Sequence, residues 1–133
     1  MQERSKKILT VDDDEDIRNS LRDMLEFEGF QTVWAKNGQV AIDYLMAVAD
    51  HELPDLVLLD YMMPVMNGRD FCQAKSKIPR LAHIPVVMMT ASGNLIKVMD
   101  NCDSEGYMSK PMDLNTVVKM VKHFLYPNDG LTA

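Results

Sequence analysis

Short apolar runs alternate five times with longer segments of helical spacing along this chain, and this alternation limits the possible folds more than any other feature. The short runs are predicted strands, and the longer segments are predicted helices. Strands that alternate with helices favour a parallel sheet, because each connection must cross over a face of the sheet. Such crossovers are right-handed. We therefore predict an α/β fold with a doubly wound, five-stranded parallel sheet and helices on both faces.

The predicted strands are bounded by polar residues, glycine or proline. In chain order they are KKILTV at 6–11, FQTVWA at 30–35, DLVLLD at 55–60, IPVVMMT at 84–90 and GYMS at 106–109. The third, DLVLLD, is apolar without alternation, as expected of a strand that is covered on both faces.

The predicted helices carry apolar residues three and four positions apart. They pass through 17–25, 41–48, 71–74, 95–102 and 114–125, and the last has the clearest pattern. We expect residues 1–126 to form a single domain and residues 127–133 to form a short polar tail.

The composition argues against several classes of function. The formal net charge is −6, with 14 Lys and Arg against 20 Asp and Glu, which disfavours non-specific binding of nucleic acid or an anionic membrane by this chain alone. The longest apolar runs are too short to span a bilayer, and residues 1–10 lack the apolar stretch of a secretory signal. Cys72 and Cys102 form no CxxC pair, and we expect reduced thiols. These observations predict a cytoplasmic protein.

Carboxylates, a hydroxyl and a lysine fall at the carboxyl ends of the predicted strands. They are Asp12 and Asp13 after the first strand, Asp60 at the end of the third, Thr90 at the end of the fourth and Lys110 after the fifth. Doubly wound sheets bind their ligands at this edge, near the point where the strand order reverses. We therefore expect these side chains to converge on one site.

The chemistry of such a site favours a divalent cation and phosphate. Two or three carboxylates suit Mg²⁺, which takes few protein ligands and keeps several waters, and a cation would relieve their mutual repulsion. A carboxylate beside the cation can attack phosphorus as a nucleophile and form an acyl phosphate. Lys110 would pair with the incoming phosphoryl group, and the Thr90 hydroxyl would donate to one of its oxygens.

Four segments carry a family resemblance: ILTVDDDEDIR, LLDYMMPVMNG, IPVVMMTA and YMSKP. They resemble the signatures of the response-regulator receiver domain of two-component signalling, and they occur in that family's order. Any one of them is a weak signal, whereas all four in order are specific. The resemblance covers about residues 6–126 and implies a flavodoxin-like fold similar to that of the chemotaxis regulators.

The resemblance implies a role for each matched residue of the acidic site. Asp60 would be the phosphoacceptor. Mg²⁺ would bind directly to Asp13, to Asp60 and to the backbone carbonyl of Met62, and Asp12 would help to hold the ion through water.

The resemblance also implies a conformational switch. The Ala91 backbone N–H would face the phosphate. Tyr107 matches the aromatic residue whose inward rotation accompanies phosphorylation, and Thr90 would move with it. A cis peptide is a further expectation between Lys110 and Pro111.

A receiver of this kind would act in phosphorelay signal transduction. It would accept its phosphoryl group from a sensor histidine kinase or a histidine phosphotransfer protein and would signal to a downstream protein target. It would catalyse only its own phosphorylation and dephosphorylation, so we do not expect an enzyme with other substrates. We expect neither direct nucleic-acid binding nor membrane attachment by this chain. A weak homodimer stays open, as does the choice between a stand-alone and an excised receiver.

The acidic residues after Asp13 need no functional role, and the alternative interpretations of the acidic cluster are weaker. Asp14 and its acidic neighbours begin a predicted helix, where they would cap backbone N–H groups. A calcium loop fails, because the position that must be glycine is Ile17 and the position that should be glutamate is Asp23. Two rival functions are an aspartyl phosphatase, whose Asp-x-Asp pair is missing at Asp60, and a receiver-fold adaptor that works without phosphorylation.

The chain departs from the family pattern at a few positions. The spacing from Thr90 to Lys110 is a couple of residues tighter than usual, and Met112 replaces a common aromatic residue. Met62 and Ser92 occupy positions that tune the loss of the phosphoryl group in this family. Because a thioether is too weak an acceptor to orient water well, we predict a phosphorylated form that lasts for minutes or more.

Overall fold

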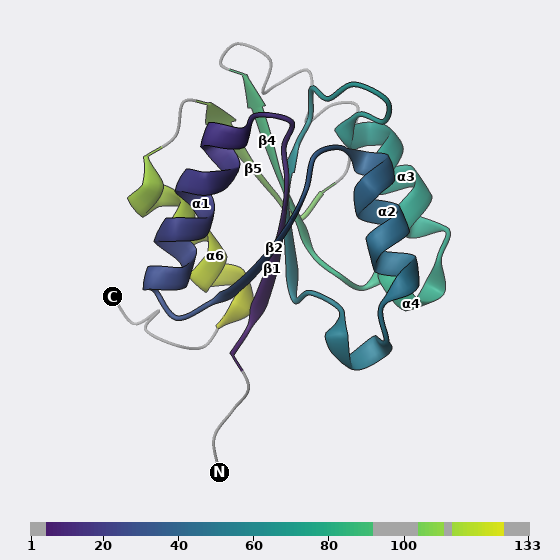
Figure 1. The fold of residues 1–133 in the computed structure, drawn as a ribbon, viewed down its shortest axis with the longest axis horizontal. Helices are drawn as coiled ribbons and strands as arrows, with labels where there is room; N and C mark the ends of the chain where they lie inside the picture. Colours follow the sequence, from purple (N-terminus) through teal and green to yellow (C-terminus); the bar gives the residue numbers. More distant parts are fainter. Residues whose placement is uncertain (1–4, 92–103, 111–112, 127–133) are drawn as a thin grey trace.

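The computed structural model describes residues 5–91, 104–110 and 113–126, and it contains a five-stranded parallel sheet (Figure 1). The strand order is β2-β1-β3-β4-β5. The strands are β1 (Lys7–Val11), β2 (Gln31–Ala35), β3 (Leu56–Asp60), β4 (Val86–Ala91) and β5 (Gly106–Lys110). The predicted fold class and the five predicted strands are confirmed, and β4 and β5 each extend one residue further than predicted.

Helices lie on both faces of the sheet, as predicted. The helices α1 (Glu15–Phe27) and α6 (Leu114–Leu125) cover one face, and α2 (Gly38–Ala47) and α3 (Gly68–Ser76) cover the other (Figure 1). The prediction extended α2 to Val48. The helix ends one residue earlier, because Val48 already has an extended backbone with ψ of 156°.

Two short helical segments escaped the sequence-based prediction. They are η1 (Asp50–Glu52) and α4 (Pro79–Ala82), and each is too short to produce a periodic apolar pattern. The predicted helix at 95–102 and the expected cis peptide before Pro111 lie outside the described residues. Within the described ranges, no helix has the length and apolar character needed to cross a membrane.

Strand β3 is buried along its whole length, as its unbroken apolar sequence predicts. Its side chains alternate between two hydrophobic clusters. Val57 and Leu59 pack with residues of α2 and α3, whereas Leu56 and Leu58 pack with residues of α1 and α6. The last residue of the strand, Asp60, is therefore held between two packed layers.

The turn from β1 into α1 is fixed by Asp14. Its carboxylate accepts hydrogen bonds from the backbone N–H groups of Asp16 at 2.9 Å and Ile17 at 3.2 Å. This is the geometry of a helix N-cap, so the capping interpretation of Asp14 is confirmed. The cap holds Asp12 and Asp13 between the end of β1 and the first turn of α1.

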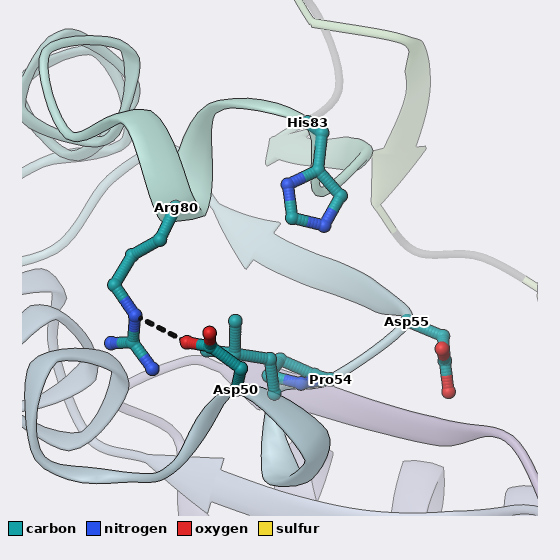
Figure 2. Close-up of a pocket in the computed structure, with 6 residues that line it drawn as sticks. Asp50, Pro54, Asp55, Arg80 and His83 are labelled. Atoms are coloured by element: carbon teal, nitrogen blue, oxygen red, sulfur yellow. Dashed lines mark hydrogen bonds and ion pairs between the residues drawn. The ribbon is translucent and has the colours of Figure 1, made fainter.

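Arg80 joins α4 to the end of α2, near the amino ends of β3 and β4. Its Nη1 donates to the Leu45 carbonyl oxygen at 2.8 Å, its Nη2 to that of Val48 at 2.6 Å, and its Nε to Asp50 Oδ1 at 2.8 Å. Figure 2 shows the guanidinium pointing at Asp50. The two residues line a pocket of about 320 Å³ at the amino ends of β3 and β4, together with Leu53, Pro54, Asp55 and His83. Every guanidinium nitrogen has a protein acceptor, so Arg80 has a structural role in this pocket.

Replacing Arg80 by alanine is expected to lower the free energy of unfolding by about 2 kcal/mol, because two helix-end carbonyls and one carboxylate lose their donor. Urea unfolding followed by circular dichroism measures this loss. The matched control is Arg69→Ala, since Arg69 is exposed on α3 and its removal changes the net charge equally. Equal losses in the two variants would contradict the bridging role.

Candidate functional site

Three carboxylates lie together at the carboxyl ends of β1 and β3, where the strand order reverses. One oxygen atom from each of Asp12, Asp13 and Asp60 lies within 4.8 Å of the other two. Asp12 is fully buried and Asp60 is 5% exposed, whereas Asp13 is exposed to solvent. This set of oxygen donors, partly open to water, fits Mg²⁺, which binds few protein oxygens and keeps several waters.

Lys110 brings a positive charge to the same place from the end of β5. Its Nζ lies 2.8 Å from Asp12 Oδ2 and 3.5 Å from Asp60 Oδ2, although Lys110 and Asp12 are 98 positions apart in the sequence. Burial lowers the pKa of Lys110, but the hydrogen bond with Asp12 and the charge of Asp60 outweigh it and leave the pKa raised. Lys110 is therefore a cation that bridges two carboxylates.

The Asp60 carboxyl is destabilised in its ionised form. Burial and the neighbouring charge of Asp12 raise its pKa from 3.8 to about 6, against the lowering effects of Lys110 and of a hydrogen bond from the Met62 backbone N–H. That N–H lies 3.3 Å from Asp60 Oδ1. One lysine does not neutralise the acidic group, so a divalent cation would be stabilised in it.

Thr90 lies on β4 beside this group. Its neighbour Met89 is paired with Asp60 in the sheet, and Thr90 is fully buried. The Thr90 hydroxyl has no hydrogen-bond partner among the residues that the structure describes. A buried hydroxyl without a partner loses its hydrogen bonds to water and gains none from the protein, which destabilises the fold. Such a position is one where a ligand or a moved side chain would supply the acceptor.

Replacing Thr90 by valine is expected to raise the free energy of unfolding of the unphosphorylated protein by about 1 kcal/mol, because the unpaired hydroxyl becomes a methyl group. The control is Thr10→Val. Thr10 is equally buried, but its hydroxyl donates to the Val33 carbonyl oxygen at 3.4 Å. Urea unfolding should rank Thr90→Val above Thr10→Val, and the reverse order would contradict the assignment.

The remaining predicted site residues lie at different distances from the acidic group. Ala91 is paired with Lys110 across β4 and β5. The Met62 side chain is 60% exposed, while its backbone contacts Asp60. Tyr107 is half-buried against the cluster between the sheet, α2 and α3, and its hydroxyl accepts a hydrogen bond from the Ser104 backbone N–H at 2.9 Å.

The loop after Asp60 is tightly shaped. A Cβ atom at Gly68 would come within 2.9 Å of the Tyr61 Cα and 3.3 Å of the Asp60 carbonyl oxygen, so only glycine lets α3 begin this close to β3. Val65 has a positive φ of 73°, and the Met66 N–H donates to the Pro64 carbonyl oxygen at 2.8 Å, which together form a γ-turn. A β-branched residue in this conformation is strained by about 1–3 kcal/mol.

Sequence analysis missed one residue that contacts the site. The Arg18 Nη1 of α1 donates to the Asp12 carbonyl oxygen at 2.9 Å. The signal for it was present, because Arg18 closes the segment ILTVDDDEDIR, but its partner depends on how α1 packs beside β1.

The fold and the site together define a class: a flavodoxin-like α/β domain with an acidic, lysine-paired site at the carboxyl edge of its sheet. The family model for the response regulator receiver domain matches residues 8–122 of the sequence. The chain belongs to the response regulator receiver domain family.

Curated relatives agree with this membership. The chain is 36% identical over 121 residues to the transcriptional regulatory protein CpxR of Escherichia coli K12, an alignment that covers 90% of this chain and 49% of CpxR. It is 35% identical over 123 residues to sporulation initiation phosphotransferase F of Bacillus subtilis, covering 91% of this chain and 94% of that protein. The chain thus spans about half the length of CpxR but nearly all of the sporulation protein.

Solved structures show the same fold. The signal receiver domain of a histidine kinase from Syntrophus aciditrophicus superposes with a TM-score of 0.83 at 28% identity, covering 95% of this chain and 94% of that one. The chemotaxis protein CheY4 of Vibrio cholerae gives a TM-score of 0.81 at 22% identity, with 91% and 99% covered, and supports the fold alone.

Proposed function

We propose that this chain is a phosphoacceptor receiver, which takes a phosphoryl group onto Asp60 in a Mg²⁺-dependent reaction. The donor would be a sensor histidine kinase or a histidine phosphotransfer protein. One observation carries the proposal: the buried Asp60 carboxylate lies 3.5 Å from the Lys110 amine, inside a group of three carboxylates.

Asp60 would act as the nucleophile. A pKa of about 6 leaves most of the carboxyl ionised at neutral pH. One carboxylate oxygen forms a bond to phosphorus, the bond between phosphorus and the donor's histidine nitrogen breaks, and the imidazole takes up a proton. Lys110 would exchange part of its contact with the two carboxylates for a phosphoryl oxygen. The chain would catalyse only this transfer and the later hydrolysis.

Asp13, Asp60 and the backbone carbonyl of Met62 would hold Mg²⁺, and Asp12 would support the ion through water. When bound, the ion neutralises charge on the phosphoryl oxygens. The proximity of the three carboxylate oxygens supports this part of the proposal.

Thr90 and Tyr107 would carry the signal. The unpaired Thr90 hydroxyl would donate to a phosphoryl oxygen, and the Ala91 backbone N–H would donate to another. Movement of Thr90 would leave room for Tyr107 to turn inward and so change the surface offered to a downstream protein target. The reaction would take place in the cytoplasm.

Incubation with a small acyl phosphate and Mg²⁺ tests the proposal directly. Intact-protein mass spectrometry should show the gain of one phosphoryl group, and a chelator should prevent it. A chain that gains no mass with Mg²⁺ present would instead favour the adaptor function.

The phosphorylated form is predicted to last for minutes or more. The exposed Met62 thioether cannot orient an attacking water, whereas an amide can. Met62→Asn is therefore expected to speed the loss of the phosphoryl group by about tenfold. Decay of the radiolabelled protein measures both rates, and loss within seconds from the unaltered chain would remove the prediction.

A further inference from the structure

We propose that Arg18 is a positioning residue for the Mg²⁺ site, held in place by Trp34. Arg18 would fix the peptide between Asp12 and Asp13 so that the Asp13 carboxylate faces the other two. The inference rests on the proposed function, because it concerns the affinity of the same site for Mg²⁺.

The Asp12 backbone is held from two sides. Its N–H donates to the Ala35 carbonyl oxygen of β2 at 3.2 Å, and its carbonyl oxygen accepts from Arg18 Nη1 at 2.9 Å. The Asp12 carbonyl and the Asp13 nitrogen belong to one planar peptide. Arg18 therefore sets the direction in which Asp13 leaves β1.

The two acids differ in how they are held. The Asp12 carboxylate accepts from the Asp14 N–H at 2.9 Å and from Lys110 at 2.8 Å, inside the protein. Asp13 is exposed, so the position of its carboxylate depends more strongly on a fixed backbone than that of Asp12 does. Loss of the Arg18 contact would leave the Asp12 carboxylate in place, and the Asp14 cap would then hold the Asp13 backbone from its C-terminal side alone.

Trp34 lies on the edge strand β2 and supports Arg18. The guanidinium carbon lies 4.3 Å from the centre of the Trp34 ring, the arrangement of a cation–π contact. The Trp34 side chain is 59% exposed, so packing in the hydrophobic core does not explain why a residue this large lies here. Stacking on a rigid ring reduces the number of conformations that Arg18 can adopt, which keeps its donor aimed at Asp12.

Charge and position predict opposite effects on Mg²⁺ binding. Arg18 is a cation near an acidic group, so its removal would tighten Mg²⁺ binding if charge alone mattered. Its removal would weaken Mg²⁺ binding if it positions Asp13. Physiological ionic strength screens the first effect more than the second.

Calorimetric titration of the full chain with Mg²⁺ decides between them. We expect Arg18→Met to raise the Kd for Mg²⁺ about tenfold, as loss of an outer contact to a metal ligand commonly does. Arg18→Lys, which keeps one donor, should recover part of the loss. Trp34→Leu should weaken binding less than Arg18→Met, Trp34→Phe should stay near the unaltered protein, and the double variant Arg18→Met/Trp34→Leu should be no weaker than Arg18→Met alone.

The matched control is Arg22→Met, one turn further along α1, where Arg22 pairs with the exposed Asp23 at 3.0 Å. It removes the same charge and should leave the Kd unchanged. Equal or tighter Mg²⁺ binding by a folded Arg18→Met variant would overturn the inference, and so would normal binding by Trp34→Leu. If the unaltered chain binds no Mg²⁺, the proposed function and the inference fail together. If the unaltered chain binds Mg²⁺ and a folded Arg18→Met variant binds it equally well, only the inference fails.

Discussion

Asp60→Asn is expected to gain no phosphoryl group under conditions that phosphorylate the unaltered chain completely. The amide has nearly the shape of the carboxylate but is not a nucleophile, so the site keeps its packing and loses its acceptor. Asp60 lies at the end of a buried strand, 3.5 Å from the Lys110 amine and in one group with two further carboxylates. Intact-protein mass spectrometry after incubation with a small acyl phosphate and Mg²⁺ measures the result.

The control for this experiment is Asp70→Asn, because Asp70 is exposed on α3 and its substitution changes the charge equally. It should gain the phosphoryl group as the unaltered chain does. A full mass gain by Asp60→Asn would assign the acceptor to another residue, with Asp13 the first to test. The same pair of variants separates a phosphoacceptor from an adaptor, whose partner binding would not depend on Asp60 chemistry.

Metal-free protein is expected to lose stability as the pH rises through about 6, and Asp60→Asn is expected to remove that loss. The pKa of Asp60 is raised in the folded state above its ordinary 3.8, so the folded state binds the proton more tightly. Its stabilising contribution is therefore complete at low pH and disappears above pH 6. A gap of roughly two pH units corresponds to about 3 kcal/mol in the free energy of unfolding.

Urea unfolding in the presence of a chelator tests this expectation. Asp60→Asn should be more stable than the unaltered protein by about 3 kcal/mol near pH 8, and by only about 1 kcal/mol near pH 4.5. Saturating Mg²⁺ should reduce the difference near pH 8, because the ion binds the folded unaltered chain. A difference that stays constant across this range would contradict the raised pKa of Asp60.

Much of the fold follows from the sequence because short, unbroken apolar runs bounded by turn residues favour buried parallel strands. The run LVLL of β3 has no polar position, and the structure buries all of it. The capping role of Asp14 follows as directly, since an acid before an apolar helical segment has few other uses. Once the strands are ordered, the meeting of Asp12, Asp13 and Asp60 follows from the geometry of parallel sheets.

The parts that sequence reasoning missed depend on contacts between elements. Arg80 finds the carbonyls at the end of α2 only because α4 packs there, and a four-residue helix has no periodic signal. Sequence reasoning brought Lys110 to the carboxylates, but it did not identify Asp12 as the partner at 2.8 Å. The stacking of Arg18 on Trp34 likewise requires α1 and β2 to lie side by side.

The central strand couples the two helical layers mechanically. Because successive side chains of β3 pack into opposite hydrophobic layers, the strand is in contact with both layers along its whole length. Closely packed interiors shift between discrete arrangements and do not stretch. Any displacement of Asp60 along its strand must therefore be absorbed by both helical layers at once. Modification of this one carboxylate would then affect two opposite surfaces of the domain.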